Sequence, residues 1–175
     1  MSAIDFQLAF GRLLRDGRLR DRFASEPALA ASLLGVTAAS AEILRALNGA
    51  DLEFQARVLL RKRSELVQRL MPRTFAALDV RAWPVFLAYA RTFWPEEPNA
   101  ALRDAAGFCR HLERTEPGVL SDTERNRMRF ALTRGRLAIH FVRDLPIRGR
   151  LRRGLQTLLR LRGDRLDERG LYLGL

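Results

Sequence analysis

Cysteine and histidine are scarce in this chain, which limits the metal and thiol chemistry open to it. Cys109 is the single cysteine among 175 residues, so an internal disulfide framework is excluded. Cys109 and His111 lie two residues apart on a predicted helix and therefore point to different faces, whereas a zinc site needs three or four converging ligands. We expect Cys109 in the core, His111 on the surface and no bound metal. His140 alternates with Ile139 and Phe141 along a predicted strand and is expected to be exposed.

Motifs of common enzyme classes and long hydrophobic runs are also missing. The sequence has no glycine-rich phosphate loop, no G-x-S-x-G turn and no H-E-x-x-H helix. We therefore expect that the chain is not an enzyme and needs no cofactor. No uncharged apolar stretch approaches the ~20 residues of a membrane span, and the first residues lack the basic and apolar regions of a signal peptide. The expectation is a cytoplasmic protein without a membrane partner.

Positive charge is what the sequence has in excess. The formal net charge is +11, and Lys62 is the single lysine among 31 basic residues. A GC-rich genome produces the same preference for arginine without any functional reason. The distribution carries more information: residues 1–120 hold 17 basic and 14 acidic residues, a net charge of +3, whereas residues 121–175 hold 14 and 6, a net charge of +8. A region of one sign attracts acidic partners.

Helical periodicity covers the first two thirds of the chain. Apolar residues recur every three or four positions, and proline, glycine, asparagine or threonine marks the ends of each periodic segment. Asp51 is expected to cap the longest helix. The predicted helices span residues 4–24, 27–35, 37–48, 52–71, 83–93 and 99–114, with a short helical turn at 74–78.

The pattern changes near residue 121. Ser121 and Glu124 form a capping-box pattern that begins a helix. Residues 128–132 and 137–142 then alternate in polarity, and with the loop 133–136 they predict a β-hairpin. One helix continuing through Thr133 is the alternative. A helix over 151–161 and a short strand over 171–173 complete the prediction. The expected fold is mainly α, with a helical domain over 1–118 and a small basic α+β appendage with a β-hairpin over 119–175.

Two features of the helical part are candidates for a protein contact. Arg61, Lys62 and Arg63 lie between apolar pairs on the long helix, where they form either a solvated face or an ion-pairing surface for a partner. Trp83 and Phe86 belong to a segment rich in aromatic residues, which fits core packing and also fits an interface, because interfaces are enriched in such residues.

The predicted hairpin offers another kind of contact. An open strand edge can accept an extended peptide through backbone hydrogen bonds, and nearby arginines would select an acidic one. The same arginines could instead bind phosphates of a nucleic acid, although neither a helix-turn-helix nor an aromatic RNA-binding motif is present. A nucleic-acid-binding protein that uses the basic C-terminal third is therefore the alternative function.

The order of motifs over about residues 40–130 resembles a known family. It resembles the small partner subunits of multinuclear non-haem iron-dependent oxidative enzymes, which modify ribosomally synthesised peptides, as in methanobactin biosynthesis. The resemblance is carried by Leu59-Leu60-Arg61-Lys62-Arg63, Val67, Pro72, Leu78, Trp83-Pro84-x-Phe86, Asp104-Ala105-x-x-Phe108, Leu112 and Glu124.

This resemblance implies a function without catalysis by the chain itself. The iron would be held by a separate oxidase chain, with which this protein would form a heterodimer, and the C-terminal part would hold the leader of a precursor peptide. The expected oxidase interface consists of Arg61, Lys62, Arg63, Trp83 and Phe86. The expected peptide-binding residues are Met128, Phe130, Leu132, Arg134, Arg136, Leu137, Ile139, Phe141 and Arg143.

Overall fold

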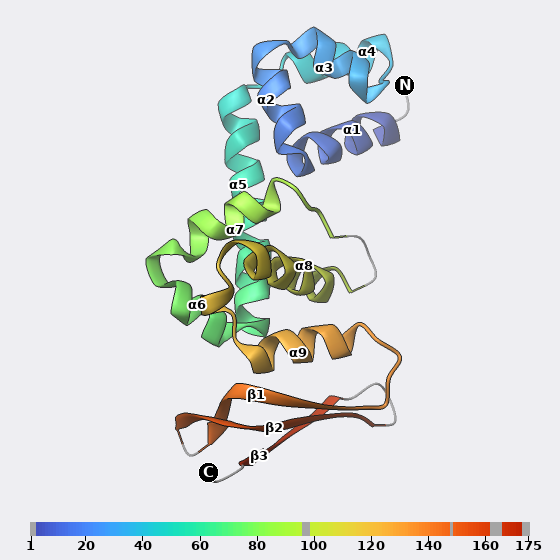
Figure 1. Ribbon diagram of the computed structural model, residues 1–175. Helices are drawn as coiled ribbons and strands as arrows, with labels where there is room; N and C mark the ends of the chain where they lie inside the picture. The colour runs from blue at the N-terminus through green and yellow to red at the C-terminus, as the bar shows by residue number, and fades with distance from the viewer. Residues whose placement is uncertain (1–2, 96–98, 148, 162–165, 173–175) are drawn as a thin grey trace. The chain divides into compact units, whose positions relative to one another are not determined.

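The fold is mainly α with a small C-terminal β part, as the sequence predicts, and this part is a three-stranded antiparallel sheet (Figure 1). The computed structural model describes residues 3–95, 99–147, 149–161 and 166–172. These residues group into two compact units, Met1–Ser64 with Ala90–Trp94, and Glu65–Tyr89 with Pro95–Leu175. The boundary expected at residue 118 falls inside the second unit, and independent folding of residues 1–118 stays a prediction.

The first unit is a cluster of short helices. It contains α1 (Ala3–Arg15), α2 (Gly17–Ser25), α3 (Pro27–Leu34), α4 (Ala38–Arg45) and the first part of α5 (Gly49–Leu70). Gly35 ends α3 with a φ of 65°, a left-handed conformation that glycine adopts without strain. Thr37 caps α4 by accepting a hydrogen bond from the backbone N–H of Ser40.

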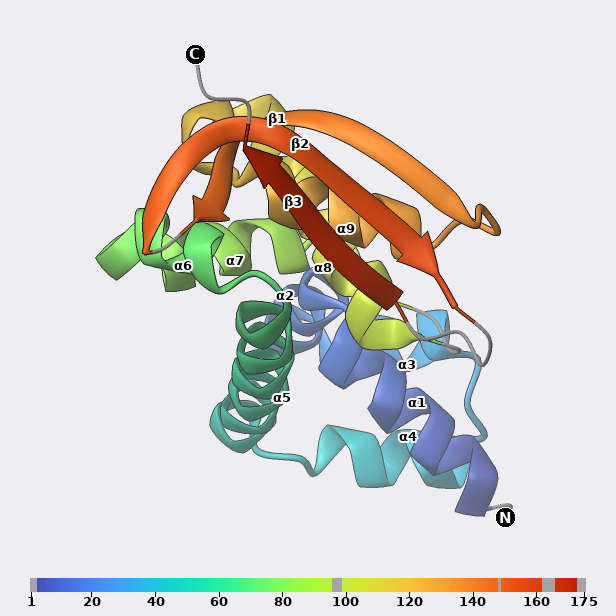
Figure 2. The same cartoon turned by 90° about the horizontal axis from the view of Figure 1, so that it is seen from below.

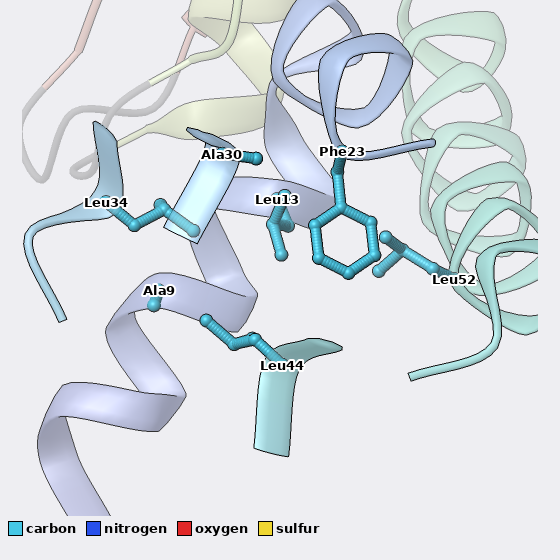
Figure 3. Packing of buried hydrophobic residues seen from close by; sticks show 7 residues of the cluster. All are labelled: Ala9, Leu13, Phe23, Ala30, Leu34, Leu44 and Leu52. Carbon is cyan, nitrogen blue, oxygen red and sulfur yellow. The ribbon is translucent and has the colours of Figure 1, made fainter. Parts of the chain in front are cut away.

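The core of the first unit is apolar and small. Figure 3 shows its seven buried side chains converging from α1 to α5: Ala9, Leu13, Phe23, Ala30, Leu34, Leu44 and Leu52. Arg20 is 9 % exposed beside this core. Its guanidinium donates to the carbonyls of Leu13 and Leu14 and pairs with Glu53 at 2.9 Å. These bonds satisfy carbonyls at the end of α1 that lack a partner within the helix.

Two predicted helices differ from the structure, one by a break and one by its start, and in both cases a local cap is the reason. The expected helix over 4–24 is broken at Asp16, whose carboxylate accepts a hydrogen bond from Leu19 N and begins α2. The longest helix starts at Gly49 rather than after Asp51, because the Asn48 side chain accepts a hydrogen bond from Ala50 N. Asp and Asn compete with the backbone for such bonds, so they interrupt helices as readily as they begin them.

The second unit packs helices around an aromatic core. After the end of α5 come α6 (Pro72–Leu78), the 3₁₀ turn η1 (Asp79–Arg81), α7 (Ala82–Ala90), α8 (Ala100–Thr115), the 3₁₀ turn η2 (Pro117–Val119) and α9 (Asp122–Ala131). Phe86 and Phe108 are fully buried, with ring centroids 5.5 Å apart, and Tyr89 lies 5.4 Å from Phe108. The Tyr89 hydroxyl donates to the Asp104 carboxylate at 2.8 Å, which satisfies a polar group that burial would otherwise penalise.

The C-terminal sheet consists of β1 (Leu137–Ile147), β2 (Arg150–Arg160) and β3 (Leu166–Tyr172), in the order β1-β2-β3. The predicted hairpin is correct for residues 137–142, which lie in β1, and wrong for residues 128–132. Of these, 128–131 end helix α9, as in the alternative prediction. The predicted helix over 151–161 is also wrong, because this segment is β2 and pairs on both sides. Leu171 lies in β3 as expected, and Leu173 lies outside the described residues.

The sheet is strongly curved, and two glycines permit this curvature (Figure 2). The side chain of Leu145 lies over Gly154 and Gly170, where an added Cβ atom would come within 2.8 Å and 2.6 Å of its methyl groups. Such distances are shorter than van der Waals contact. At Gly154 the added atom would also meet the backbone carbonyl oxygen of Leu171 at 2.6 Å, so glycine is required there, whereas at Gly170 the Leu145 side chain would have to shift. The curvature brings β1 over β3, across the middle strand.

Candidate peptide-binding surface

The two faces of the sheet are assigned by strand pairing, because paired residues of antiparallel strands point to the same side. One face, called the inner face, contacts α9 (Figure 1) and carries Ala138, His140, Val142, Gly154, Gln156, Leu158, Glu168 and Gly170. The other face, called the outer face, carries Leu137, Ile139, Phe141, Leu155, Thr157, Leu159, Asp167, Arg169 and Leu171. The prediction that His140 is exposed is wrong: His140 is half-buried, whereas Ile139 and Phe141 are exposed.

The nine expected peptide-binding residues are distributed over four environments. Met128 and Phe130 are buried in α9 and cannot form part of a strand edge. Leu132, Arg134 and Arg136 are exposed between α9 and β1, and Leu137, Ile139 and Phe141 are exposed on the outer face. Arg143 is bonded to the start of α9. The structure therefore gathers Leu137, Ile139, Phe141 and the two preceding arginines along one end of β1.

The edge of β1 is regular only in its first half. The pairing with β2 shifts between Val142 and Leu145, which marks a β-bulge, and Pro146 follows near the end of the strand. Bulges and proline are common ways to prevent pairing at a strand edge. At the bulge, Arg143 donates its backbone N–H and its guanidinium to Asp122. Residues 137–142 are therefore the part of this edge suited to an added strand.

The bond between Asp122 and Arg143 has an electrostatic consequence. Arg143 lies across from the carboxylate with Nε at 2.7 Å, and its hydrogen bonds are the main cause that lowers the pKa of Asp122 below its usual value. Burial of Asp122 acts in the opposite direction but is the smaller effect. The pKa of Arg143 is raised by the same contact. Both groups are therefore charged at neutral pH, and they connect β1 to the start of α9.

Two other carboxylates cap helices that are distant in sequence. Glu124, which is 1 % exposed, accepts hydrogen bonds from the backbone N–H groups of Arg73 and Thr74 and from the Thr74 hydroxyl. These are the first N–H groups of α6, which have no partner within the helix. In the same way Asp144 of β1 accepts from the N–H of Thr123 at the start of α9. A carboxylate at a helix N-terminus is favoured by the partial positive charge there.

The inner face contacts α9 through hydrogen bonds as well as apolar packing. Gln156, fully buried on β2, accepts from the Asn126 side chain and donates to the Thr123 carbonyl. Its second N–H bonds Glu168 on β3 at 2.8 Å. At the other end, the Arg160 guanidinium donates to the carbonyls of Phe130, Ala131 and Thr133, where α9 ends. The sheet is therefore fixed on α9 at the start, middle and end of the helix.

A cavity of about 340 Å³ adjoins the bulge of β1. Arg73, Asp122, Arg143 and Asp144 form its polar side, and apolar residues, among them Leu151, line the rest. The Arg73 guanidinium pairs with Asp144 at 3.8 Å, and Arg143 pairs with Asp122 as described above, so each positive charge of the cavity has a negative partner. The cavity is large enough for one side chain of a bound peptide.

The residues expected at the oxidase interface lie in both units. Arg61 and Lys62 are exposed on α5 in the first unit. Arg63 is buried there, donates to the Phe93 carbonyl at 3.1 Å and stacks on the Trp94 ring at 4.3 Å. Trp83 is half-buried in the second unit, and Phe86 is fully buried in its aromatic core. Arg61 and Lys62 are the members that offer an exposed side chain for contact.

The thiol and imidazole groups lie within or beside the core. Cys109 is buried as expected, and burial, with Glu113 and Glu124 nearby, raises the pKa of its thiol to about 12. His111 is half-buried rather than on the surface, and burial is the main cause that lowers its pKa. Within residues 3–95, 99–147, 149–161 and 166–172, no three Cys, His, Asp or Glu side chains form a group suited to a metal ion. Across the same residues, no helix combines the length and apolar character needed to cross a membrane.

Comparison with known proteins gives one similarity. Residues 28–114 match the family model described as SCO6045-like, C-terminal domain, which covers just under half of the chain. The matched region runs from α3 to the last turn of α8, so α9 and the sheet lie outside it. No curated protein and no solved structure matches the chain.

Proposed function

We propose that this protein is a non-catalytic binding subunit of a peptide-modifying complex. Its helical part docks on an iron-dependent oxidase, and its C-terminal sheet binds the leader of the precursor peptide. The observation that carries the proposal is the sheet itself, in which residues 137–142 form a regular edge segment with exposed Leu137, Ile139 and Phe141. An extended peptide can pair with such a segment.

Positive charge beside this segment supports an acidic leader. Arg134 and Arg136 are exposed immediately before β1, and residues 121–175 carry a net charge of +8.

The direct test searches the neighbourhood of the gene for an iron oxidase and a short precursor-peptide reading frame, and combines their products with this chain. We expect the chain and the oxidase to elute together in size-exclusion chromatography at low salt, and the precursor to bind this chain alone. Separate elution would remove the docking part of the proposal. Replacement of Arg61 and Lys62 by Glu should weaken oxidase docking and leave peptide binding unchanged, because both side chains are exposed and the sheet is untouched.

The edge is tested by Ile139→Pro, which removes a backbone donor and restricts the strand. Peptide affinity should fall at least tenfold. Ile139→Ala, which shortens the same side chain but keeps the backbone N–H, is the matched control and should lower affinity clearly less than Ile139→Pro, provided that circular dichroism shows a folded protein in both cases. The double change Arg134→Glu with Arg136→Glu is independent of strand geometry. It should weaken an acidic leader and reduce the salt dependence of binding. Equal affinities for Ile139→Pro and wild type would place the peptide elsewhere.

Nucleic-acid binding remains the second candidate, because the C-terminal third is basic. Several of its arginines already have roles inside the fold: Arg143 binds Asp122, and Arg160 binds the end of α9. The slope of log affinity against log salt would measure the phosphates neutralised, about −0.9 for each on duplex DNA. We expect no retardation of DNA or RNA at about 50 mM salt, conditions under which a phosphate-binding protein is retarded.

A further inference from the structure

The outer face of the sheet is an apolar feature that the proposed strand pairing leaves unused. Six of its nine residues are large and apolar, and the row Phe141-Leu155-Leu171 is apolar across all three strands. Leu137 and Ile139 are 58 % exposed, Phe141 60 % and Leu171 61 %, while Leu155 and Leu159 between them are half-buried. Exposed apolar residues that gather on one face in this way are a mark of binding surfaces.

We infer that the outer face is a docking surface for an acidic amphipathic helix. The identity of this helix rests on the proposed function, in which it belongs to the leader of the precursor peptide, next to the segment that pairs with β1. The leader would then have two parts, one strand at the edge and one helix across the face. This specifies the class of peptide: acidic, with apolar residues at helical spacing.

A helix is favoured over a strand because of what a sheet face offers. Backbone hydrogen-bonding groups of a sheet point along its plane, so a strand can bind only at an edge, whereas a helix covers a face with an apolar stripe. On the inner face the helix α9, of 10 residues, already lies against the sheet. A guest helix of similar length would cover the rows of the outer face.

Acidic character is favoured by the charges around the face. Arg169 lies on the outer face beside Thr157. Arg153 lies two residues before Leu155 on β2 and therefore on the same side, and Arg136 directly precedes Leu137. All three are exposed, and the single carboxylate of the face, Asp167, bonds Arg169 at 3.0 Å. A second copy of this chain would bring the same arginines and a further charge of +11, so like charges would oppose each other. An acidic helix meets complementary charge instead.

The test uses a fluorescent amphipathic peptide of about 18 residues, with leucines on one face and glutamates on the other. Its counterpart carries lysine in place of every glutamate. Fluorescence anisotropy with the full-length protein should show binding of the glutamate peptide and at least tenfold weaker binding of the lysine peptide. Phe141→Ser and Leu171→Ser should each weaken binding at least fivefold. Phe54→Ser is the matched control, since Phe54 is 63 % exposed in the first unit, and should change affinity less than twofold.

Several results would overturn the inference. These are no binding of the glutamate peptide, equal binding of both peptides, or affinities that do not respond to Phe141→Ser and Leu171→Ser. A dimer in sedimentation that Leu171→Ser abolishes would show that a second copy occupies the face. The precursor peptide separates this inference from the proposed function. If its affinity falls with Ile139→Pro but not with Phe141→Ser, strand pairing stands and the helix site is wrong. If the glutamate peptide binds the face and the precursor does not bind the protein, the docking surface stands and the leader role is wrong.

Discussion

The two faces of the C-terminal sheet depart from the usual division into an apolar buried face and a polar exposed face. The inner face, which contacts α9, carries the buried Val142 and Leu158 among small and polar residues such as Ala138, Gly154 and Gln156. The outer face carries large apolar residues that are exposed. In most half-exposed antiparallel sheets the large apolar side chains point to the core. Here hydrogen bonds and close backbone approach hold the inner face, and the apolar side chains of the outer face remain available for a partner.

The difference in burial between the two faces is tested most directly by replacing one leucine on each face with alanine. Leu158→Ala on the inner face should lower the free energy of unfolding by about 2–5 kcal/mol, because it leaves a cavity in a fully buried site. Leu171→Ala on the outer face should change it by less than about 0.5 kcal/mol, as exposed substitutions do. Urea denaturation measures both values. Similar losses for the two variants would mean that the outer face is buried in the folded protein.

A smaller loss is expected from Glu124→Ala, which removes the caps of α6. The change leaves two backbone N–H groups and the Thr74 hydroxyl without their acceptor in a buried site, at a cost of about 2–3 kcal/mol. Hydrogen exchange should speed up at Arg73 and Thr74 more than at the inner-face residues of β2. The control is Glu65→Ala, because Glu65 is exposed on α5. Stability that is unchanged in Glu124→Ala would show that these bonds contribute little.

Gly170→Ala tests the close packing of the inner face. A Cβ atom at this position would meet the side chain of Leu145, so we expect a loss of about 1–3 kcal/mol. Leu145→Val should recover part of the loss in the double variant, although alone it removes buried apolar contact. A double-variant cycle in urea denaturation measures this coupling. Gly118→Ala serves as control, because no atom lies within 4 Å of the position of its Cβ.

The smallest effect concerns pH. The pKa of Asp122 is lower in the folded protein than in the unfolded chain, where an aspartate has a pKa of about 4. Its bond to Arg143 therefore contributes its full stability at pH values above about 4. The contribution is lost as the pH falls through the lower pKa of the folded state. Asp122→Asn should therefore melt at a lower temperature than wild type at pH 7, and the difference should shrink towards pH 3. A constant difference over this range would show that ionisation of Asp122 is not involved.

The sequence predicts the helical part better than the sheet, because helix signals are local. Gly35 ends α3 and Thr37 begins α4, both as expected, because each residue acts on the helix next to it. Residues 151–161 have leucines at both helical and strand spacing, so their own pattern does not decide between the two structures. Pairing with the neighbouring strands β1 and β3 makes them a strand.

Of the candidate site, too, the sequence predicts only what local signals determine. Alternation in residues 137–142 correctly separates Ile139 and Phe141 from His140, but alternation alone does not say which face is buried. That choice depends on Gln156 and the glycines of β2 and β3, which fit against α9 and Leu145. The capping box at Ser121 correctly indicates a helix start, whereas the role of Glu124 at α6 depends on a contact 50 residues away.

The helix caps by distant carboxylates also impose an order on folding. The start of α6 is completed only when α9 supplies Glu124, and the start of α9 only when β1 supplies Asp144. Each of these helix N-termini is therefore completed only after a segment that is synthesised later. Contacts between residues so far apart in sequence slow folding. A ribosome-bound chain that ends at residue 118 would hold α6 with its first N–H groups exposed to water. We expect the second unit to gain its stability in one late step, once β1 has emerged.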